Sequence, residues 1–206
     1  MKKILLSIVA LAAITVSTVS AQAPQGWTFG PKAGITISNG TNQPSDANSK
    51  YKVGFTGGAF VEYGLSNEWL GLSAEVLYSS QGAKQDDYTD EGVKITDNKE
   101  NLNYLNIPIL AKFYVLRGLS INAGIQPGFL LGAKGSWKED GHKESRTGTE
   151  GLKTFDFSVP VGLSYSFDCG LIIDARYNIG VTKVPDFVDA PNSKNSVFAV
   201  TLGWRF

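Results

Sequence analysis

The fold is decided by the stretch Val197-Phe198-Ala199-Val200-Thr201-Leu202-Gly203-Trp204-Arg205-Phe206. Side chains of a β-strand alternate between its two faces. One face of this stretch therefore carries only large apolar groups and ends on two aromatic rings, while the other carries small or polar groups. Soluble proteins tend to end in polar, frayed residues. A barrel strand that faces lipid has a reason to end on an aromatic residue, although a soluble sandwich with an amphipathic last strand is the alternative at this point.

The same alternation recurs along the chain, in segments close to the ~9–11 residues that a tilted strand needs to cross a bilayer. The segments cover residues 27–37, 52–63, 69–80, 103–115, 119–131, 155–167, 171–181 and the last ten residues. The links between them are alternately short (64–68, 116–118, 168–170) and long and polar (38–51, 81–102, 134–153, 185–194). The pattern predicts an all-β, eight-stranded, antiparallel up-and-down transmembrane β-barrel with short periplasmic turns and four longer extracellular loops. An even number of strands places both mature termini in the periplasm.

The first residues have the features of a secretory signal peptide. Met1-Lys2-Lys3 is positively charged, residues 4–19 carry no charge, and Ala21 and Ala23 provide small-residue cleavage sites. The uncharged run is shorter than the ~20 apolar residues of a membrane anchor. We expect a signal peptide over residues 1–21, cleaved after Ala21 or Ala23, and a single barrel domain over residues 22–206.

Composition excludes several classes of function. Charged residues make up only 18% of the chain and the net charge is zero, which leaves no basic footprint for nucleic acid. One cysteine and one histidine exclude an internal disulfide and a Cys/His metal site. No mature segment is apolar for long enough to form a transmembrane helix, so a membrane location requires a closed barrel. We expect a monomer with no metal and no cofactor.

Alternation alone does not identify the outer face, because a soluble lipocalin-like barrel has the same period and an apolar lumen. Two features indicate that the apolar face is the outer face and contacts lipid. The polar face is poor in charge, and its charged residues are Lys32, Lys52, Glu62, Glu75, Lys112, Asp156, Asp174, Arg176 and Arg205. Aromatic residues gather at the short-turn ends of the apolar face, as in the girdle at a membrane interface: Trp27, Phe29, Tyr63, Phe113, Tyr165, Phe167, Trp204 and Phe206.

The nine charged residues of the polar face predict a lumen filled by ion pairs. Buried charges must be paired, and an eight-stranded barrel is only wide enough inside for side chains to fill. We expect Lys112 and Arg176 to neutralise Glu75, Asp156 or Asp174. A narrow conducting path through the lumen is the alternative.

Four prolines lie inside the expected strands: Pro31, Pro108, Pro127 and Pro160. Proline lacks the N–H that a sheet ladder uses, and a closed barrel has no edge strand to hold it. We therefore expect local bulges at these residues, or strand boundaries slightly different from those above.

Several segments resemble known outer-membrane sequences. The terminal Phe206 after alternating apolar residues resembles the C-terminal signature of bacterial outer-membrane proteins, which the barrel-assembly machinery recognises in those families. Residues 104–114 (YLNIPILAKFY) resemble the Tyr-Leu-x-Ile-Pro-x-Leu-x-Lys strand of the PorT-like outer-membrane β-barrel family, residues 122–131 its next strand, and residues 174–181 its Arg-Tyr-x-x-Gly segment. The resemblance implies a bacterial outer-membrane location, contact with outer-membrane lipid and with the assembly machinery, and a link to secretion or other envelope machinery.

The loops offer little chemistry. The one histidine, His142, has Asp140 and Ser145 near it in sequence, but a loop does not hold a nucleophile within hydrogen-bond reach of its base. The acidic stretch 86–92 (DDYTDEG) lacks the Asp-x-Asp-x-Asp-Gly spacing of a calcium loop. We predict a non-enzymatic protein with a structural or interaction role through its extracellular loops. The alternatives are a narrow-pore transport or ligand-binding outer-membrane protein, a soluble lipocalin-like binder, and an enzyme that depends on His142.

Overall fold

The computed structural model describes residues 23–41, 49–66, 69–85, 88–90, 93–139, 142–184 and 194–206. The expected signal peptide over residues 1–21 lies outside the described residues. Among the residues described, no helix is long and apolar enough to cross a membrane.

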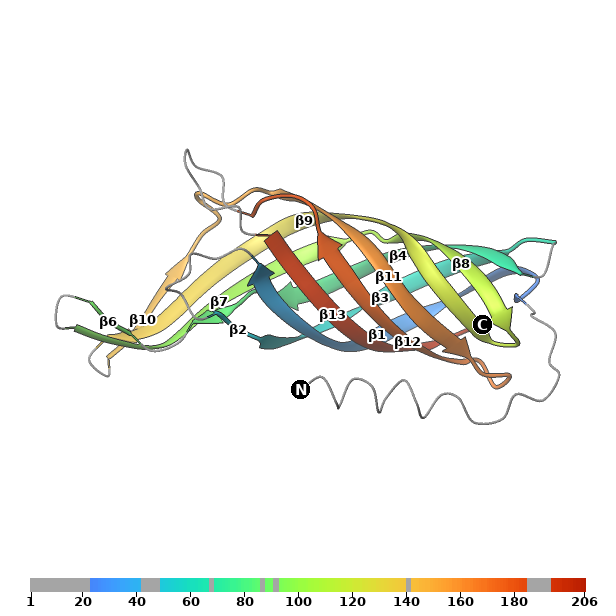
Figure 1. The fold of residues 1–206 in the computed structure, drawn as a ribbon, viewed down its shortest axis with the longest axis horizontal. Coiled ribbons are helices and arrows are strands. Elements are labelled where there is room, and N and C mark those ends of the chain that lie inside the picture. Colours follow the sequence, from blue (N-terminus) through green and yellow to red (C-terminus); the bar gives the residue numbers. More distant parts are fainter. Residues whose placement is uncertain are drawn as a thin grey trace.

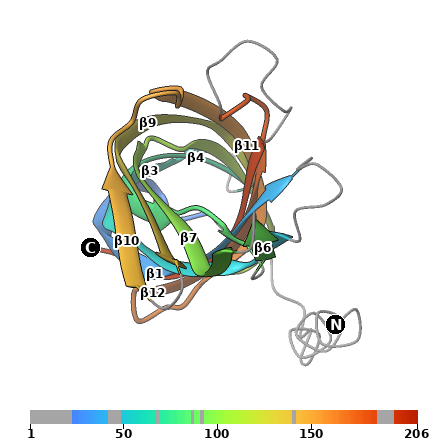
Figure 2. The ribbon, with the colours of Figure 1, turned by 90° about the vertical axis from the view of Figure 1, so that its left-hand side faces the viewer.

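Eight long antiparallel strands pair with their neighbours and close into a ring (Figure 1, Figure 2). One of the eight is interrupted and counts as two elements, β7 and β8. The strands of the ring are β1 (Gly26–Thr41), β3 (Lys52–Gly64), β4 (Leu70–Gln81), β7 (Val93–Asn106) with β8 (Ile109–Leu116), β9 (Leu119–Glu139), β11 (Phe155–Ser166), β12 (Leu171–Gly180) and β13 (Lys194–Trp204). β13 pairs with β1 from Lys32↔Gly203 to Thr41↔Lys194, which closes the barrel. The predicted eight-stranded antiparallel barrel is confirmed.

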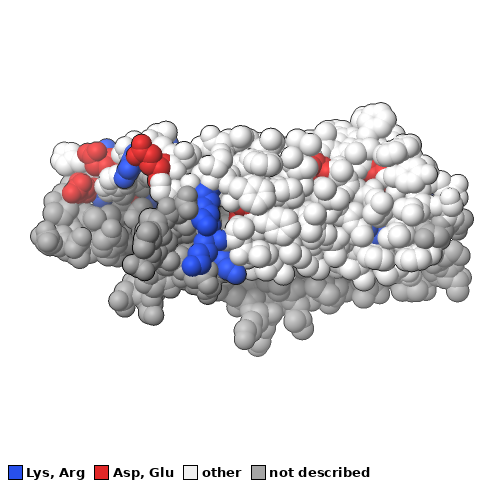
Figure 3. All heavy atoms as spheres, turned by 90° about the horizontal axis from the view of Figure 1, so that it is seen from above, with Lys and Arg blue, Asp and Glu red and all other residues white. Residues whose placement is uncertain are grey.

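Burial alternates along each strand because one face lines the lumen and the other faces out. In β13, Thr201 is 3% exposed whereas its neighbour Leu202 is 55% exposed. The outward residues are large and apolar on every strand of the ring, and the barrel surface seen in Figure 3 is almost free of charge. This is the reverse of a lipocalin-like barrel. An apolar exterior of this extent is the surface of a barrel that lies in lipid.

On one side the strands continue far beyond the expected loop boundaries. Residues 93–102 and 134–139 were expected in long loops, but they extend β7 and β9, which pair as far as Ile95↔Glu139. Two short strands join them, β6 (Tyr88–Asp90) on β7 and β10 (His142–Thr147) on β9. We call residues 88–90, 93–101, 135–139 and 142–147 the projecting sheet, which forms the left end of Figure 1. The expected boundaries were wrong because residues such as Lys99, Ser136 and Lys138 carry no apolar alternation that would mark a strand.

The length of β9 requires this projection. Its 21 residues are about twice the ~9–11 residues that a tilted strand needs to cross a bilayer. Two further short strands, β2 (Ser49–Lys50) and β5 (Lys84–Gln85), pair with each other at the same end of the barrel. The opposite end has only short turns and holds Phe206, marked C in Figure 1.

The four prolines produce no bulge. The pairings across Pro31, Pro127 and Pro160 keep one register, and the recorded register shifts in the described strands lie elsewhere, for example between Asn103 and Tyr104. Only the alternative expectation of a changed boundary is correct, at Pro108, which separates β7 from β8. The ladder continues past it because the Pro108 carbonyl accepts a hydrogen bond from the Glu75 N–H at 2.9 Å.

Glycine allows β1 and β13 to approach closely at the closing seam. A Cβ at Gly34 would lie 2.0 Å from the carbonyl oxygen of Val200. We expect Gly34→Ala to reduce barrel closure, measured as the fraction of refolded protein that shows the heat-dependent gel shift of a closed barrel. Gly132→Ala is the control, because a Cβ there has no atom within 4 Å. Equal refolding of the two variants would contradict the role of Gly34.

Candidate functional site

A cluster of charged side chains fills the middle of the lumen. The Nζ of Lys32 in β1 lies 2.8 Å from Oε1 of Glu75 in β4, and the guanidinium of Arg176 in β12 donates to both Glu75 oxygens at 2.9 and 3.0 Å. Arg176 also lies 3.2 Å from Asp174. In the ring of eight strands β4 and β12 are diametrically opposite, so the Arg176–Glu75 pair joins the two far walls. We call Lys32, Glu75, Asp174 and Arg176 the central cluster.

Neutral side chains complete the hydrogen bonding of the central cluster. Asn122 of β9 donates to Asp174 at 3.3 Å and to the hydroxyl of Ser164 at 2.8 Å. Ser120 bridges the same Asn122 and Ser164 at 2.9 and 3.0 Å. Two cations face two anions, and all four charged groups are at least 94% buried. The cluster is therefore electrically balanced and linked to β9 and β11 as well.

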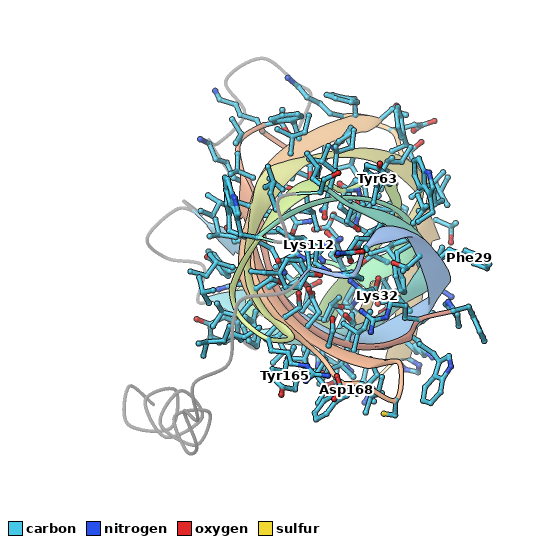
Figure 4. The ribbon with its side chains drawn as sticks, turned by 90° about the vertical axis from the view of Figure 1, so that its right-hand side faces the viewer. Phe29, Lys32, Tyr63, Lys112, Tyr165 and Asp168 are labelled. Carbon is cyan, nitrogen blue, oxygen red and sulfur yellow. The ribbon has the colours of Figure 1, made fainter. Side chains whose placement is uncertain are left out.

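A second charged cluster lies nearer the short-turn end. Lys112 of β8 donates to Glu62 of β3 at 2.6 Å, and the Tyr114 hydroxyl makes a short hydrogen bond to the other oxygen of the same carboxylate. Figure 4 shows Lys32 and Lys112 inside the ring. The expectation that Lys112 neutralises Glu75, Asp156 or Asp174 was wrong in its partner. The reason is the register, which places Lys112 opposite Gly71 of β4 and leaves it facing Glu62 across that glycine.

Three of the nine predicted lumen charges take no part in these two clusters. Lys52 is buried and donates to the carbonyl of Gln81 at 2.7 Å. Asp156 accepts a short hydrogen bond from Thr182, and Arg205 is half-buried at the short-turn end. Sequence reasoning also missed Tyr114 and Asn122 as partners. Their positions on the polar face were the available signal, but which charges they meet depends on the register of non-adjacent strands.

An apolar layer lies on the lumen side of β7 and β9, on the projecting side of the central cluster. Leu102, Tyr104, Leu130 and Ala133 are buried together, and the partly buried Leu152 and Val184 pack against them. Between this layer and the central cluster lies a cavity of about 20 Å³, which is the space of about one water molecule. Arg176, Asn178 and Thr201 line it, each with one buried polar atom that has no hydrogen-bond partner among the described residues. The lumen therefore holds the central cluster and the apolar layer at successive levels along its axis.

The eight predicted girdle residues are all exposed and lie at the short-turn end. Several of their rings pack in pairs. The ring centroids are 4.8 Å apart for Trp27 and Tyr63, 6.2 Å for Phe29 and Phe206, and 4.7 Å for Tyr165 and Phe167. Figure 4 shows Phe29 and Tyr165 on the outside of the ring. The pairs Phe55–Tyr78 and Phe129–Phe155 lie toward the projecting end. Sequence reasoning missed this second group because it considered only the short-turn ends.

The loop chemistry considered from the sequence is not assembled in the described residues. His142 and Ser145 are both exposed on β10, where they pair with Glu139 and Ser136. Asp140, Asp86, Asp87 and Glu91 lie outside the described residues, and residues 88–90 of the acidic stretch form β6. Among the residues described, no group of three His, Cys, Asp or Glu side chains has the geometry to hold a metal ion.

Removing one charge of the central cluster should be costly. Arg176→Met leaves Glu75 and Asp174 facing Lys32 alone, and we expect a loss of about 3–5 kcal/mol in the free energy of unfolding. The double variant Glu75→Gln, Arg176→Met retains a balanced Lys32–Asp174 pair and should be less destabilised. Urea unfolding in detergent would measure the free energy of unfolding of both variants, with the exposed Lys143→Ala as the control. A single variant as stable as the control would indicate a hydrated lumen.

Comparison with known proteins agrees with the barrel. A search of curated protein sequences found no match. Among solved structures, Ail, the attachment invasion locus protein of Yersinia pestis, matches with a TM-score of 0.51 and 17% identity over 89% of this chain and 100% of that chain. Neisserial surface protein A (NspA) matches with a TM-score of 0.52 and 14% identity, over 88% of this chain and 100% of that chain. The model of the outer membrane protein beta-barrel domain family matches residues 20–186, and the chain therefore belongs to that family.

Proposed function

We propose that this protein is a non-conducting, non-enzymatic integral protein of the bacterial outer membrane that presents the projecting sheet as an interaction surface. One observation carries the proposal. β7 and β9 do not end at the membrane boundary but continue as a paired sheet, flanked by β6 and β10. A barrel that serves only as a membrane plug has no need of this extension.

The projecting sheet has the properties of a preformed surface. All six residues of β10 are exposed, and the register shift in β7 is stabilised by ion pairs. There Asp97, with a φ of 55°, accepts a hydrogen bond from Lys138 at 2.7 Å. That hydrogen bond lowers the pKa of Asp97 below its ordinary value. A surface ordered before binding spends less conformational entropy on complex formation than a flexible loop does.

The filled lumen supports an interaction role outside the barrel rather than transport of a solute through it. A transported solute would have to displace the Arg176–Glu75 pair that joins opposite walls and then cross the apolar layer around Tyr104 and Leu130. Both layers are desolvated, and breaking a buried ion pair without compensation costs several kcal/mol. The resemblance of residues 104–114 to PorT-like proteins supports an envelope partner, linked to secretion or related machinery.

The proposed orientation can be tested with the protein's own cysteine. Cys169 is exposed in the short turn between β11 and β12, which we place in the periplasm together with both mature termini. A membrane-impermeant maleimide should label Cys169 only after the outer membrane is permeabilised. In a Cys169→Ser background, Ser145→Cys on β10 should be labelled in intact cells. Labelling of Cys169 in intact cells would reverse the orientation.

The occluded lumen can be tested by planar-bilayer recording. Purified barrel protein should insert without discrete channel openings, because the central cluster and the apolar layer leave no continuous water path. Removal of the projecting sheet should not create conductance, since both layers lie within the barrel. Steady single-channel openings of the wild-type protein would favour the narrow-pore alternative.

A further inference from the structure

Three lysines mark the outer limit of the apolar surface on three adjacent strands. Beyond Leu131 the next exposed residue of β9 that faces out is Lys134, between the buried Ala133 and the half-buried Gly135. Lys183 follows Val181 at the end of β12, and Lys153 precedes Phe155 at the start of β11. Each lysine is therefore the first charged residue beyond an exposed apolar one. We call Lys134, Lys153 and Lys183 the lysine belt.

Backbone hydrogen bonds bring the three lysines to the same region of the barrel wall. The Lys153 N–H donates to the Val184 carbonyl at 2.9 Å, which places Lys153 beside Lys183. The Leu130 N–H donates to the Thr154 carbonyl at 2.7 Å, which places Lys153 beside the part of β9 that leads into Lys134. Lys153 and Lys183 point away from the lumen because their neighbours Leu152 and Val184 pack against the apolar layer inside it. Figure 3 shows basic side chains in a band between the uncharged barrel surface and the projecting sheet.

No described carboxylate pairs with the lysine belt. Asp156 accepts a hydrogen bond from Thr182, and Glu150 pairs with Arg146. Glu100 of β7 lies opposite Gly135, next to Lys134 in the register, but forms none of the ion pairs described. The outward residues at the same end of β3 and β4, such as Val53 and Tyr78, are uncharged. The charge of the lysine belt thus lies over β9, β11 and β12, at the limit of the exposed apolar surface.

We propose that the lysine belt binds the phosphate groups of anionic lipid headgroups in the membrane leaflet at the projecting end. This inference rests on the proposed function, because it requires the barrel to be embedded in lipid. Lysine stems can lie along apolar surface while the ammonium groups reach the headgroups. A lysine near an anionic membrane surface is worth about 1 kcal/mol, which corresponds to roughly fivefold in affinity.

The experiment uses a soluble lipid with a single phosphate headgroup. Dioctanoyl phosphatidic acid is titrated by calorimetry into the mature protein in neutral detergent, with dioctanoyl phosphatidylcholine and inorganic phosphate as comparison ligands. Wild-type protein should bind phosphatidic acid more tightly than either comparison ligand, and high ionic strength should weaken this binding. Lys134→Gln, Lys153→Gln, Lys183→Gln together should raise the Kd about a hundredfold.

The matched control removes three positive charges from the projecting sheet, as Lys99→Gln, Lys138→Gln, Lys143→Gln. Its Kd should stay within about twofold of wild type, because these lysines lie outside the lysine belt. The control should also fold, because exposed ion pairs contribute little to stability. The heat-dependent gel shift checks the fold of each variant, and Lys153→Gln alone should weaken binding about fivefold if the triple variant does not fold. An unchanged Kd in the folded belt variant, an equal loss in the control, or inorganic phosphate binding as tightly as phosphatidic acid would overturn the inference. A reversed orientation in the cysteine labelling would instead contradict the proposed function.

Discussion

A peptide backbone in hydrocarbon has no water to bond to, so each N–H and C=O must find its partner inside the sheet. The rest of the structure depends on this constraint. It requires the ring to close between β1 and β13, where Gly34 lets the two backbones approach. It also explains the prolines, because the ladder keeps its register past them and loses only the bonds that proline cannot donate. Closure in turn divides every strand into an outer face for lipid and an inner face with no access to it.

The inner face must then satisfy its own charges. Buried ion pairs are weak contributors to stability when compared with apolar packing, because both partners are desolvated. The central cluster is better understood as a constraint on geometry. Arg176 meets Glu75 only if β4 and β12 lie opposite each other, and Lys112 meets Glu62 only in the observed register of β3, β4 and β8. A ring with a shifted register would leave these groups buried and unpaired, so we infer that the clusters favour one closed form.

The sequence predicted those features that lipid imposes and failed where lipid has no influence. Alternation in 197–206 separated the two faces of the strand. The low charge of the polar face and the aromatic girdle then identified the apolar face as the outer one, which made Glu75 and Arg176 lumen residues. The pairing of Lys112 with Glu62 was not predictable, because it joins strands that are not neighbours and depends on register. The projecting sheet was missed for a different reason. Outside the bilayer both faces of a strand meet water, and residues such as Ser136 and Lys138 carry no apolar alternation.

β9 passes through all of these environments in one continuous strand. Near the short turn Ile121 faces lipid while Asn122 supports the central cluster, and at Leu130 the inner face becomes apolar. From Lys134 onward no outward residue of the strand is apolar, although the backbone continues to pair with β7 and β10. We infer that the change between Leu131 and Lys134 marks the membrane boundary, because the side chains change there while the backbone pairing does not. Hydrogen bonding continues past this point, so the projecting sheet is held rigidly to the barrel.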